Sequence, residues 1–174
     1  MTFNIVNHAI AYERDLESIL TRPTMRKATR NMAFGIAAME KALEPYPNLT
    51  KEYGFEMGLV LSTNTGELST TLDFLNTFYS TKIARPLLFQ NSLHNATTGF
   101  LAIQYGLKGP ALTLSSLPFG EEQALDTASL LITTGQCRFC VVISVDVWPK
   151  ADGINYNKNE IYDYGAFVTS LKDQ

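Results

Sequence analysis

The sequence predicts an α/β fold of three layers, with helices on both faces of a mixed five-stranded sheet. Apolar runs of β-capable residues alternate along the chain with longer segments in which apolar residues recur every three or four positions. Such alternation is typical of parallel or mixed sheets that are covered on both faces. The chain has 174 residues, of which 45% are hydrophobic and 18% charged. It is therefore long enough to bury a core as a single domain over residues 1–174.

Five segments have the composition of strands. Phe3–Ala9 alternates apolar and polar residues as a half-buried strand does, whereas Phe55–Leu61 and Phe139–Val145 are apolar runs typical of buried strands. We expect the strands at about residues 3–9, 55–62, 111–117, 139–146 and 166–172.

Between these strands, apolar residues recur at helical spacing. The broadest apolar stripe lies in Arg26–Leu43 and ends at Pro45. Small residues dominate His94–Ile103, and such a helix is expected in the centre of a fold, where other backbone comes close. Further helices are expected at Glu13–Leu20, Glu67–Tyr79 and Glu121–Thr134, with irregular chain at Tyr46–Tyr53 and Leu87–Leu93.

Charge and segment composition argue against several classes of function. The formal net charge is -3 at pH 7. The basic residues are scattered apart from a loose cluster at Arg22, Arg26, Lys27 and Arg30, which disfavours nucleic acid binding. No apolar run approaches the roughly 18 residues that span a bilayer, and the start of the chain lacks the pattern of a signal peptide. We therefore expect a cytoplasmic protein that binds neither nucleic acid nor membrane.

Cys137 and Cys140 form a Cys-x-x-Cys pair at the start of a predicted strand. Residues three apart in a strand face opposite sides of the sheet, and cysteine is among the most buried residue types. No second cysteine pair accompanies them, and His8 and His94 are distant in the sequence. We expect buried structural cysteines, with neither a metal site nor a redox motif, and we expect no cofactor.

The rest of the chain is organised around a predicted strand, turn and helix. The apolar run Ala111–Leu117 stops at Pro118 and Gly120, and helical spacing follows from Glu121 to Thr134. In many α/β enzymes such an elbow presents a nucleophile beside helix N–H groups that stabilise an anion. Pro118 has neither a reactive heteroatom nor an N–H group. The elbow therefore has the form of a catalytic site without a catalytic side chain.

Seven segments, in one order, resemble the N-terminal half of β-ketoacyl synthases, which have the thiolase-like fold. They are Arg26–Leu43, Gly58–Gly66, Arg85–Phe89, Asn95 with Gly99 and Tyr105–Pro110, Ala128–Gly135, Val141–Asp146, and Tyr162–Phe167. The chain is most similar to the short synthase-like type found beside aryl polyene and related polyketide pathways, some members of which are labelled chain-length factors. The resemblance implies that the first four strands are mainly parallel and that the last is antiparallel.

Two departures from active synthases suggest that catalysis is lost. Counting from Gly109-Pro110, the family's nucleophilic cysteine falls on Pro118, and Ser115-Ser116-Leu117 stands in place of the usual Asp-Thr-Ala. The two catalytic histidines of such synthases lie in a C-terminal half with no counterpart here, and neither His8 nor His94 replaces them. We therefore expect a non-catalytic partner or scaffold in polyketide or fatty-acid-type biosynthesis, which binds a synthase subunit or an acyl carrier protein. The alternatives are an acyl-thioester-binding protein and an acyltransferase with unorthodox catalytic residues.

The polar residues next to the elbow have structural explanations. Ser115 and Ser116 lack a local base that could activate a hydroxyl, and serines at strand ends usually satisfy turn or cap hydrogen bonds. Glu121 and Glu122 stand in the first turn of a helix, where the dipole favours carboxylates. No residue is predicted to be catalytic or to bind a metal.

Three polar residues farther away are likewise expected to have structural roles. His94 precedes a helix of small residues and is expected to be a hydrogen-bonded residue at the helix start. Asp146 and Asp163, near strand ends, are expected to fix loops as hydrogen-bond acceptors.

Contacts with a partner or substrate are expected at the elbow and on two helices. The candidate residues are Ser116, Pro118, Phe119, His94, Asn95 and Leu131. In the family the two halves pack through central helices, one of which resembles Glu121–Thr134, whose apolar residues cover more than one stripe. A bare face of this kind is larger than a soluble monomer usually exposes. We therefore expect a homodimer, or a heteromer with a synthase-like chain, through this helix or the strand Ala111–Leu117.

Overall fold

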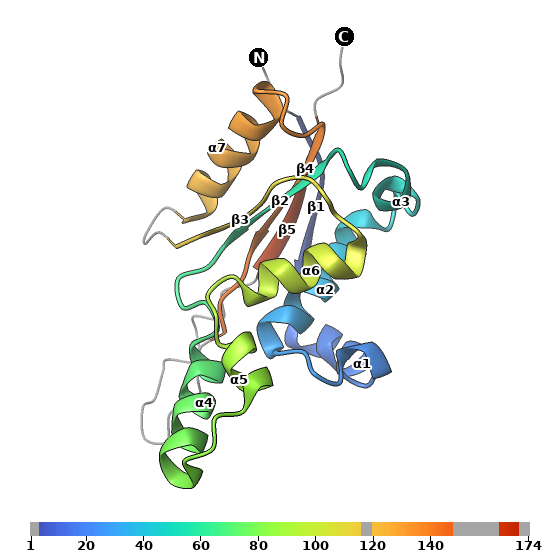
Figure 1. The fold of residues 1–174 in the computed structure, drawn as a ribbon. Helices are drawn as coiled ribbons and strands as arrows, with labels where there is room; N and C mark the ends of the chain where they lie inside the picture. Colours follow the sequence, from blue (N-terminus) through green and yellow to red (C-terminus); the bar gives the residue numbers. More distant parts are fainter. Residues whose placement is uncertain (1–3, 116–119, 148–163, 171–174) are drawn as a thin grey trace.

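The computed structural model of the chain describes residues 4–115, 120–147 and 164–170 (Figure 1). Its strands are β1 (Asn4–Ala11), β2 (Met57–Ser62), β3 (Ala111–Leu114), β4 (Phe139–Ser144) and β5 (Tyr164–Ser170). They lie in one sheet in the order β1-β5-β4-β2-β3. β2 pairs in parallel with both β3 and β4, whereas β5 is antiparallel to β4 and β1. The expected α/β architecture with a mixed sheet is confirmed.

Seven α-helices are present in the described part of the chain. They are α1 (Leu16–Leu20), α2 (Arg30–Leu43), α3 (Leu49–Tyr53), α4 (Leu68–Thr81), α5 (Pro86–Asn91), α6 (Ala96–Tyr105) and α7 (Gly120–Thr133). Short 3-10 turns, Glu13–Asp15 and Pro23–Met25, flank α1. No helix among these is long and apolar enough to cross a membrane.

The prediction of irregular chain is wrong in two places. α5 occupies most of Leu87–Leu93 and begins at Pro86. Proline is favoured at the first helical position, where its missing N–H group costs nothing. α3 lies within Tyr46–Tyr53 and buries none of its residues, so it has no apolar stripe that could reveal it.

Three strands are shorter than predicted, and one of them is β4, which ends at Ser144 instead of residue 146. β2 starts at Met57 because a turn, closed by the hydrogen bond from Glu56 N to Tyr53 O at 2.8 Å, keeps Phe55 outside the sheet. β3 ends at Leu114, and the rest of the segment expected to be a strand, from residue 116, lies outside the described residues.

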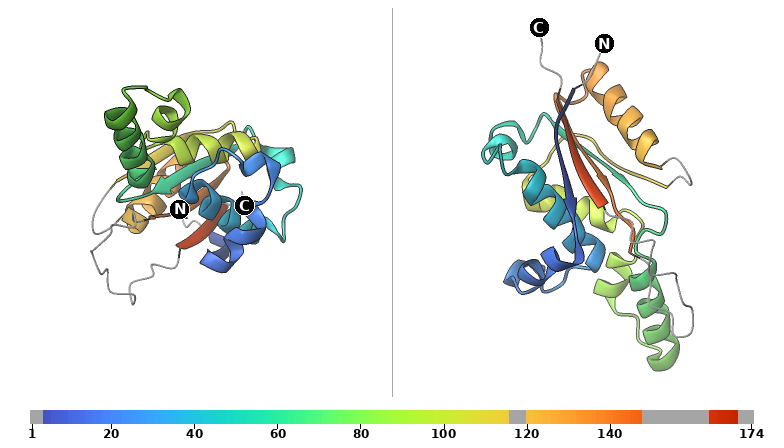
Figure 2. Two further views of the ribbon diagram at one scale, coloured as in Figure 1. Left: turned by 90° about the horizontal axis from the view of Figure 1, so that it is seen from below. Right: turned by 180° about the vertical axis from the view of Figure 1, so that it is seen from behind.

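The helices form two layers around the sheet (Figure 2). α2 and α6 pack on one face, and α7 packs on the other. Successive residues of a strand point to opposite faces. Leu59 and Val141 therefore enter the core beneath α2, whereas Val60 and Val142 enter the core beneath α7.

α2 is the central helix of the larger core. Thr29 caps its start, because the Thr29 hydroxyl accepts a hydrogen bond from Met32 N at 3.2 Å. Every residue from 31 to 39 is buried, since the sheet, α1 and α6 surround the helix. Gly35 permits the close approach of α6: a Cβ at this position would lie 2.6 Å from Leu101 Cδ1.

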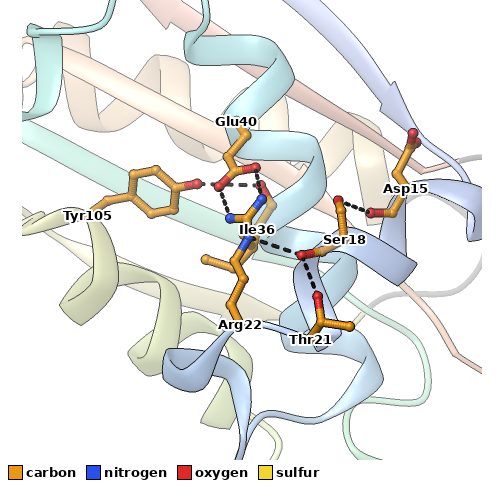
Figure 3. A network of polar contacts seen from close by, with 7 residues as sticks. All are labelled: Asp15, Ser18, Thr21, Arg22, Ile36, Glu40 and Tyr105. Carbon is orange, nitrogen blue, oxygen red and sulfur yellow. Dashed lines mark hydrogen bonds and ion pairs between the residues drawn. The ribbon is translucent and has the colours of Figure 1, made fainter.

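Polar contacts join α2 to the segments on either side of it (Figure 3). Arg22 forms a bidentate ion pair with Glu40 and also donates from Nε to Ser18 O at 3.3 Å. The Tyr105 hydroxyl donates to Ile36 O at 3.4 Å. Burial raises the pKa of Tyr105, so this hydroxyl remains a donor. These contacts fix α1 and α6 against α2.

Candidate functional site

The turn after β2, residues 63–66, lies at the carboxyl edge of the parallel strands and is held by Asp146, which follows β4. Asp146 Oδ1 accepts hydrogen bonds from the N–H groups of Asn64 and Thr65 and from the hydroxyls of Thr63 and Thr65, each at 2.8 Å. The Asp146 side chain is buried. Its predicted role as a loop-fixing acceptor is confirmed, whereas Asp163 lies outside the described residues.

Glu67 is a buried carboxyl group at the start of α4. Glu67 Oε1 accepts hydrogen bonds from the Thr29 hydroxyl at 2.8 Å and from the Thr97 hydroxyl, and Oε2 accepts one from the Thr70 hydroxyl at 3.2 Å. Burial raises the pKa of Glu67, and the three hydroxyl contacts offset part of this rise. The group connects α2, α4 and α6 at one point.

Asn31, in the first turn of α2, is the second buried polar group beside this turn. Asn31 Nδ2 donates to Gly66 O. Asn31 Oδ1 is buried and has no hydrogen-bond partner among the described residues. A buried amide oxygen without a donor is costly, so this atom marks a position where a ligand N–H or O–H group would be favoured.

A cavity of about 370 Å³ lies beside Asn31 and Glu67, between the starts of α2 and α4 and one side of α5. Arg26, Lys27, Ala28, Thr29, Arg30, Ser69, Thr70, Asp73, Leu87, Leu88, Asn91 and Val147 complete its lining. Arg30 is paired with Glu13. Arg26 and Lys27 form no ion pair within the described chain, and they share the cavity wall with the carboxyl groups of Glu67 and Asp73. The cavity thus combines cations, one open acceptor and an apolar side, and its walls contain no cysteine, histidine or tyrosine.

The predicted elbow residues Ser116, Pro118 and Phe119 lie outside the described residues, but their flanks are placed. On one side, Leu114 O accepts a hydrogen bond from Thr63 N at 2.9 Å. On the other side, a Cβ on Gly120 would lie 2.4 Å from Ser62 Oγ. Both flanks therefore adjoin the carboxyl end of β2, next to the turn that Asp146 holds.

His94 and Asn95 lie at the start of α6, beside the same turn. The His94 ring packs against Gly66, because a Cβ on Gly66 would lie 2.3 Å from His94 Nδ1. Gly66 also has a positive φ of 54°. Both side chains are exposed, and neither forms a hydrogen bond within the described chain. The prediction that His94 is hydrogen-bonded at the helix start is therefore wrong. The exposed ring is available for contacts beyond this chain.

α7 has one buried stripe, whereas the sequence led us to expect two. Leu131 is 6% exposed and packs in the core with Ile132, Val60 and Val142, so its side chain is not on the outer face. The large apolar residue on that face is Leu130, which is 60% exposed. Leu131 is thus a core residue of this chain, and any partner contact on α7 falls to Leu130 and its polar neighbours.

α6 is also less enclosed than its small residues suggested. Thr97, Thr98 and Leu101 face the core, and the Thr98 hydroxyl contacts that of Thr113 in β3 at 2.5 Å. Ile103 is exposed, and a Cβ on Gly99 would meet no atom within 4 Å. The prediction of a centrally buried helix is therefore correct for one face only.

The hairpin formed by α4, α5 and the segment between them has an apolar surface that was not predicted from the sequence. None of the residues in α4 or α5 is buried. The exposed apolar side chains are Leu72, Leu75, Phe78, Tyr79, Ile83, Leu87, Phe89 and, just beyond α5, Leu93. Figures 1 and 2 show this hairpin (green) projecting from the body of the domain. The signal was present in the sequence, because apolar residues lie on more than one side of Leu68–Thr81.

The comparisons with known proteins agree with this fold. The model of the β-ketoacyl synthase N-terminal domain matches residues 32–159. No significant match was found among curated protein sequences.

Several solved structures share the architecture. The ishigamide ketosynthase/chain length factor aligns with a TM-score of 0.74 at 22% identity, over 90% of this chain and 48% of that one. A complex of a type II polyketide synthase acyl-carrier protein with its hexaketide-bound ketosynthase, AntDE:AntF, aligns with a TM-score of 0.78 at 15% identity, over 92% of this chain and 52% of that one. The ketosynthase ApeO in complex with its chain length factor ApeC, from Xenorhabdus doucetiae, aligns with a TM-score of 0.71 at 16% identity, over 99% of this chain and 80% of that one.

The chain spans about half the length of the first and second of these proteins. The family model, in contrast, covers well over half of the chain and includes β2, β3, β4 and the elbow between β3 and α7. The fold and the match together establish that this chain belongs to the β-ketoacyl synthase N-terminal domain family.

Proposed function

We propose that this chain is a non-catalytic synthase-like subunit that binds a β-ketoacyl synthase in polyketide or fatty-acid-type biosynthesis, aryl polyene pathways among them. The observation that carries the proposal is the apolar hairpin of α4 and α5. Its eight exposed apolar side chains form a surface of the kind that marks protein interfaces. Proteins with this fold include a ketosynthase solved together with its chain length factor, which supports a synthase-like partner.

The free edge of β3 supports the same proposal. β3 ends the sheet order, and its outer edge pairs with no other strand in the described chain. Unpaired strand edges readily pair with another chain. Leu112 in β3 is exposed, so an apolar contact can accompany strand pairing. We propose that β3 and the hairpin together contact the partner, which is either a synthase-like chain or a second copy of this one.

Binding to a synthase can be tested with exposed residues that the fold does not need. Tyr79 is 67% exposed and Ile83 is 63% exposed, so Tyr79→Asp and Ile83→Asp should leave the domain folded. We expect the wild-type chain to co-elute in size-exclusion chromatography with a β-ketoacyl synthase from the same organism, and each variant to weaken binding at least tenfold. Phe55→Asp is the matched control, because Phe55 is 75% exposed but precedes the amino-terminal end of β2, whereas the hairpin follows the carboxyl end of that strand. Equal binding by all four proteins would contradict the assignment of the hairpin.

We propose the absence of catalysis on the basis of Pro118, and a separate experiment tests it. A proline cannot form an acyl-enzyme, so purified chain mixed with an acyl thioester should release thiol no faster than buffer does. Pro118→Cys supplies a thiol but no histidine to activate the acyl acceptor, so slow acylation without sustained turnover is expected. Sustained thiol release by the wild-type chain would support the alternative, an acyltransferase with unorthodox catalytic residues.

The cavity favours a second function, the binding of an acyl thioester or an acyl carrier protein. Arg26 and Lys27 would attract the phosphate of a carrier arm or an acidic protein surface, and Leu87 and Leu88 would contact an apolar group. Calorimetric titration with an acyl-coenzyme A tests this function. We expect Arg26→Glu with Lys27→Glu to weaken binding at least tenfold, whereas Lys51→Glu on α3 should have no effect. No heat of binding to wild type, with either an acyl-coenzyme A or an acyl carrier protein, would exclude this second function.

A further inference from the structure

Cys137 and Cys140 lie on the same side of the sheet, although the sequence predicted opposite sides. Cys137 precedes β4 instead of lying in it, so strand alternation does not apply between the two residues. Both are buried in the core beneath α7. No disulfide joins them. They are the only cysteines of the 174-residue chain.

The two sulfur atoms meet over Gly58 of β2. A Cβ on Gly58 would lie 3.1 Å from Cys137 Sγ and 3.5 Å from Cys140 Sγ, so the sulfurs cannot be farther apart than these two distances combined. Gly58 pairs with Cys140 in the parallel register of β2 and β4. The missing side chain at Gly58 thus provides the space that both thiols share.

Cys137 is the thiol nearer to solvent. It is 6% exposed, whereas Cys140 is fully buried. It lies four residues beyond the end of α7, between exposed residues 133–136 and exposed Arg138. Gly135, with a φ of 71°, reverses the chain there, and Cys137 N bonds to Leu131 O at 3.3 Å. A small opening of this turn would expose Cys137 without separating β4 from β2.

The environments of the two thiols differ in the direction that sequential oxidation requires. A hydrogen bond with the Cys140 thiol lowers the pKa of Cys137, although burial opposes this. The same hydrogen bond, together with burial, raises the pKa of Cys140. Cys137 is therefore the better nucleophile, and Cys140 is a protonated neighbour close behind it.

We propose that Cys137 and Cys140 form a dithiol site that a hydroperoxide converts to an intramolecular disulfide in the folded protein. The Cys137 thiolate attacks the terminal oxygen of the peroxide, which forms a sulfenic acid and releases hydroxide or alkoxide. Cys140 then attacks the Cys137 sulfur and the S–S bond forms, while the sulfenic hydroxyl leaves as water with the proton of the Cys140 thiol. With hydrogen peroxide, two thiols and one peroxide thus give one disulfide and two waters.

Trypsin provides a direct readout, because Arg138 lies between the two cysteines. Cleavage after Lys108, Arg138 and Lys150 places Cys137 in peptide 109–138 and Cys140 in peptide 139–150. Native protein is treated with hydrogen peroxide, denatured, alkylated, digested and analysed by mass spectrometry. We expect the two peptides to be joined, to carry no alkyl group, and to separate after reduction. In Cys140→Ser, Cys137 should stop at sulfenic acid or higher oxides, whereas in Cys137→Ser, Cys140 should stay alkylatable.

The wild-type measurement alone can overturn the proposal, even if a variant fails to fold. Joined peptides only after oxidation in denaturant would mean that the native thiols do not react with each other. Two alkylated peptides after oxidation of native protein would mean that the site is inert. Joined peptides that run as a covalent dimer before digestion would mean that the disulfide is intermolecular. Each of these three results excludes the dithiol site.

Discussion

Removal of the Asp146 carboxylate should unfold the turn that adjoins the elbow. The carboxylate receives four hydrogen bonds at 2.8 Å, two from backbone N–H groups and two from threonine hydroxyls. Their donors are all in residues 63–65, whereas Asp146 follows β4 more than 80 positions later in the sequence. The contact therefore joins two neighbouring strands, β2 and β4, where they end.

The expected size of the effect follows from the number and burial of these donors. A hydrogen bond to a charged acceptor contributes about 1.5 to 3 kcal/mol. The turn is only partly buried, so water can replace some of the lost contacts, and the four contributions will not add fully. We expect Asp146→Ala to lower the free energy of unfolding by about 3 to 5 kcal/mol. Asp146→Asn keeps Oδ1 but loses the charge, so it should cost about 1 to 2 kcal/mol.

Urea denaturation followed by circular dichroism measures both values. Domains of this size are stable by about 5 to 15 kcal/mol, so Asp146→Ala should shift the transition midpoint to much lower urea without changing its slope. Asp73→Ala is the control, because the Asp73 side chain is exposed and forms no hydrogen bond within the described chain. The prediction is wrong if the unfolding free energy of Asp146→Ala lies within about 1 kcal/mol of wild type, which is the contribution of a single ordinary hydrogen bond. It is also wrong if the alanine and asparagine variants lose equal amounts of unfolding free energy.

Three further experiments test other parts of the fold. Burial raises the pKa of Glu67, so the protonated side chain favours the folded state at low pH, and this stabilisation is lost as the pH rises from the ordinary glutamate pKa through the raised one. Over that interval Glu67→Gln should therefore become more stable relative to wild type. Parallel curves of unfolding free energy against pH for the two proteins would contradict this. Leu131→Asp should lower the free energy of unfolding by about 3 kcal/mol or more, because it places a charge in the core. Leu130→Asp should change the free energy of unfolding by less than about 0.5 kcal/mol. If α7 contacts a partner, Leu130→Asp should alter only the sedimentation of the protein. A Cβ on Gly109 would lie 2.4 Å from Met57 O, so Gly109→Ala should destabilise the domain by about 1 to 3 kcal/mol. A Cβ on Gly99 would meet no atom within 4 Å, so Gly99→Ala should stabilise α6 by about 0.5 to 1 kcal/mol. Thermal unfolding of both variants and of wild type measures the two effects.

Local sequence patterns predicted the helices and strands whose apolar side chains are buried within this chain. The stripe of Arg26–Leu43 predicted α2, and the apolar runs predicted β2 and β4, because these elements bury their side chains against one another. The positions of α3 and α5 could not be predicted from apolar spacing, since neither has a buried residue. At α5 the available signal was Pro86, which begins a helix as readily as it ends one.

The candidate site was predicted only in part. Strand ends and the elbow pointed to the correct edge of the sheet, and Asp146 was identified as a loop-fixing residue there. Glu67 and Asn31 were missed because each is an ordinary polar residue at a helix start in the sequence. In the fold Glu67 bonds to Thr29 and Thr97, and Asn31 bonds to Gly66. These partners are about 30 or more positions apart in the sequence, so no local pattern reveals the burial of either residue.

The contrast between α2 and α4 gives the strongest physical reason to expect a partner. Both helices have 14 residues and both are rich in apolar side chains. α2 buries eleven of its residues, whereas α4 buries none. Full burial of one large apolar side chain is worth about 1.5 to 3 kcal/mol, so the exposed residues of α4 and α5 leave much of that free energy unused in the isolated chain. An association that covers this hairpin would recover it, and the assembled state should therefore unfold at higher temperature than the chain alone.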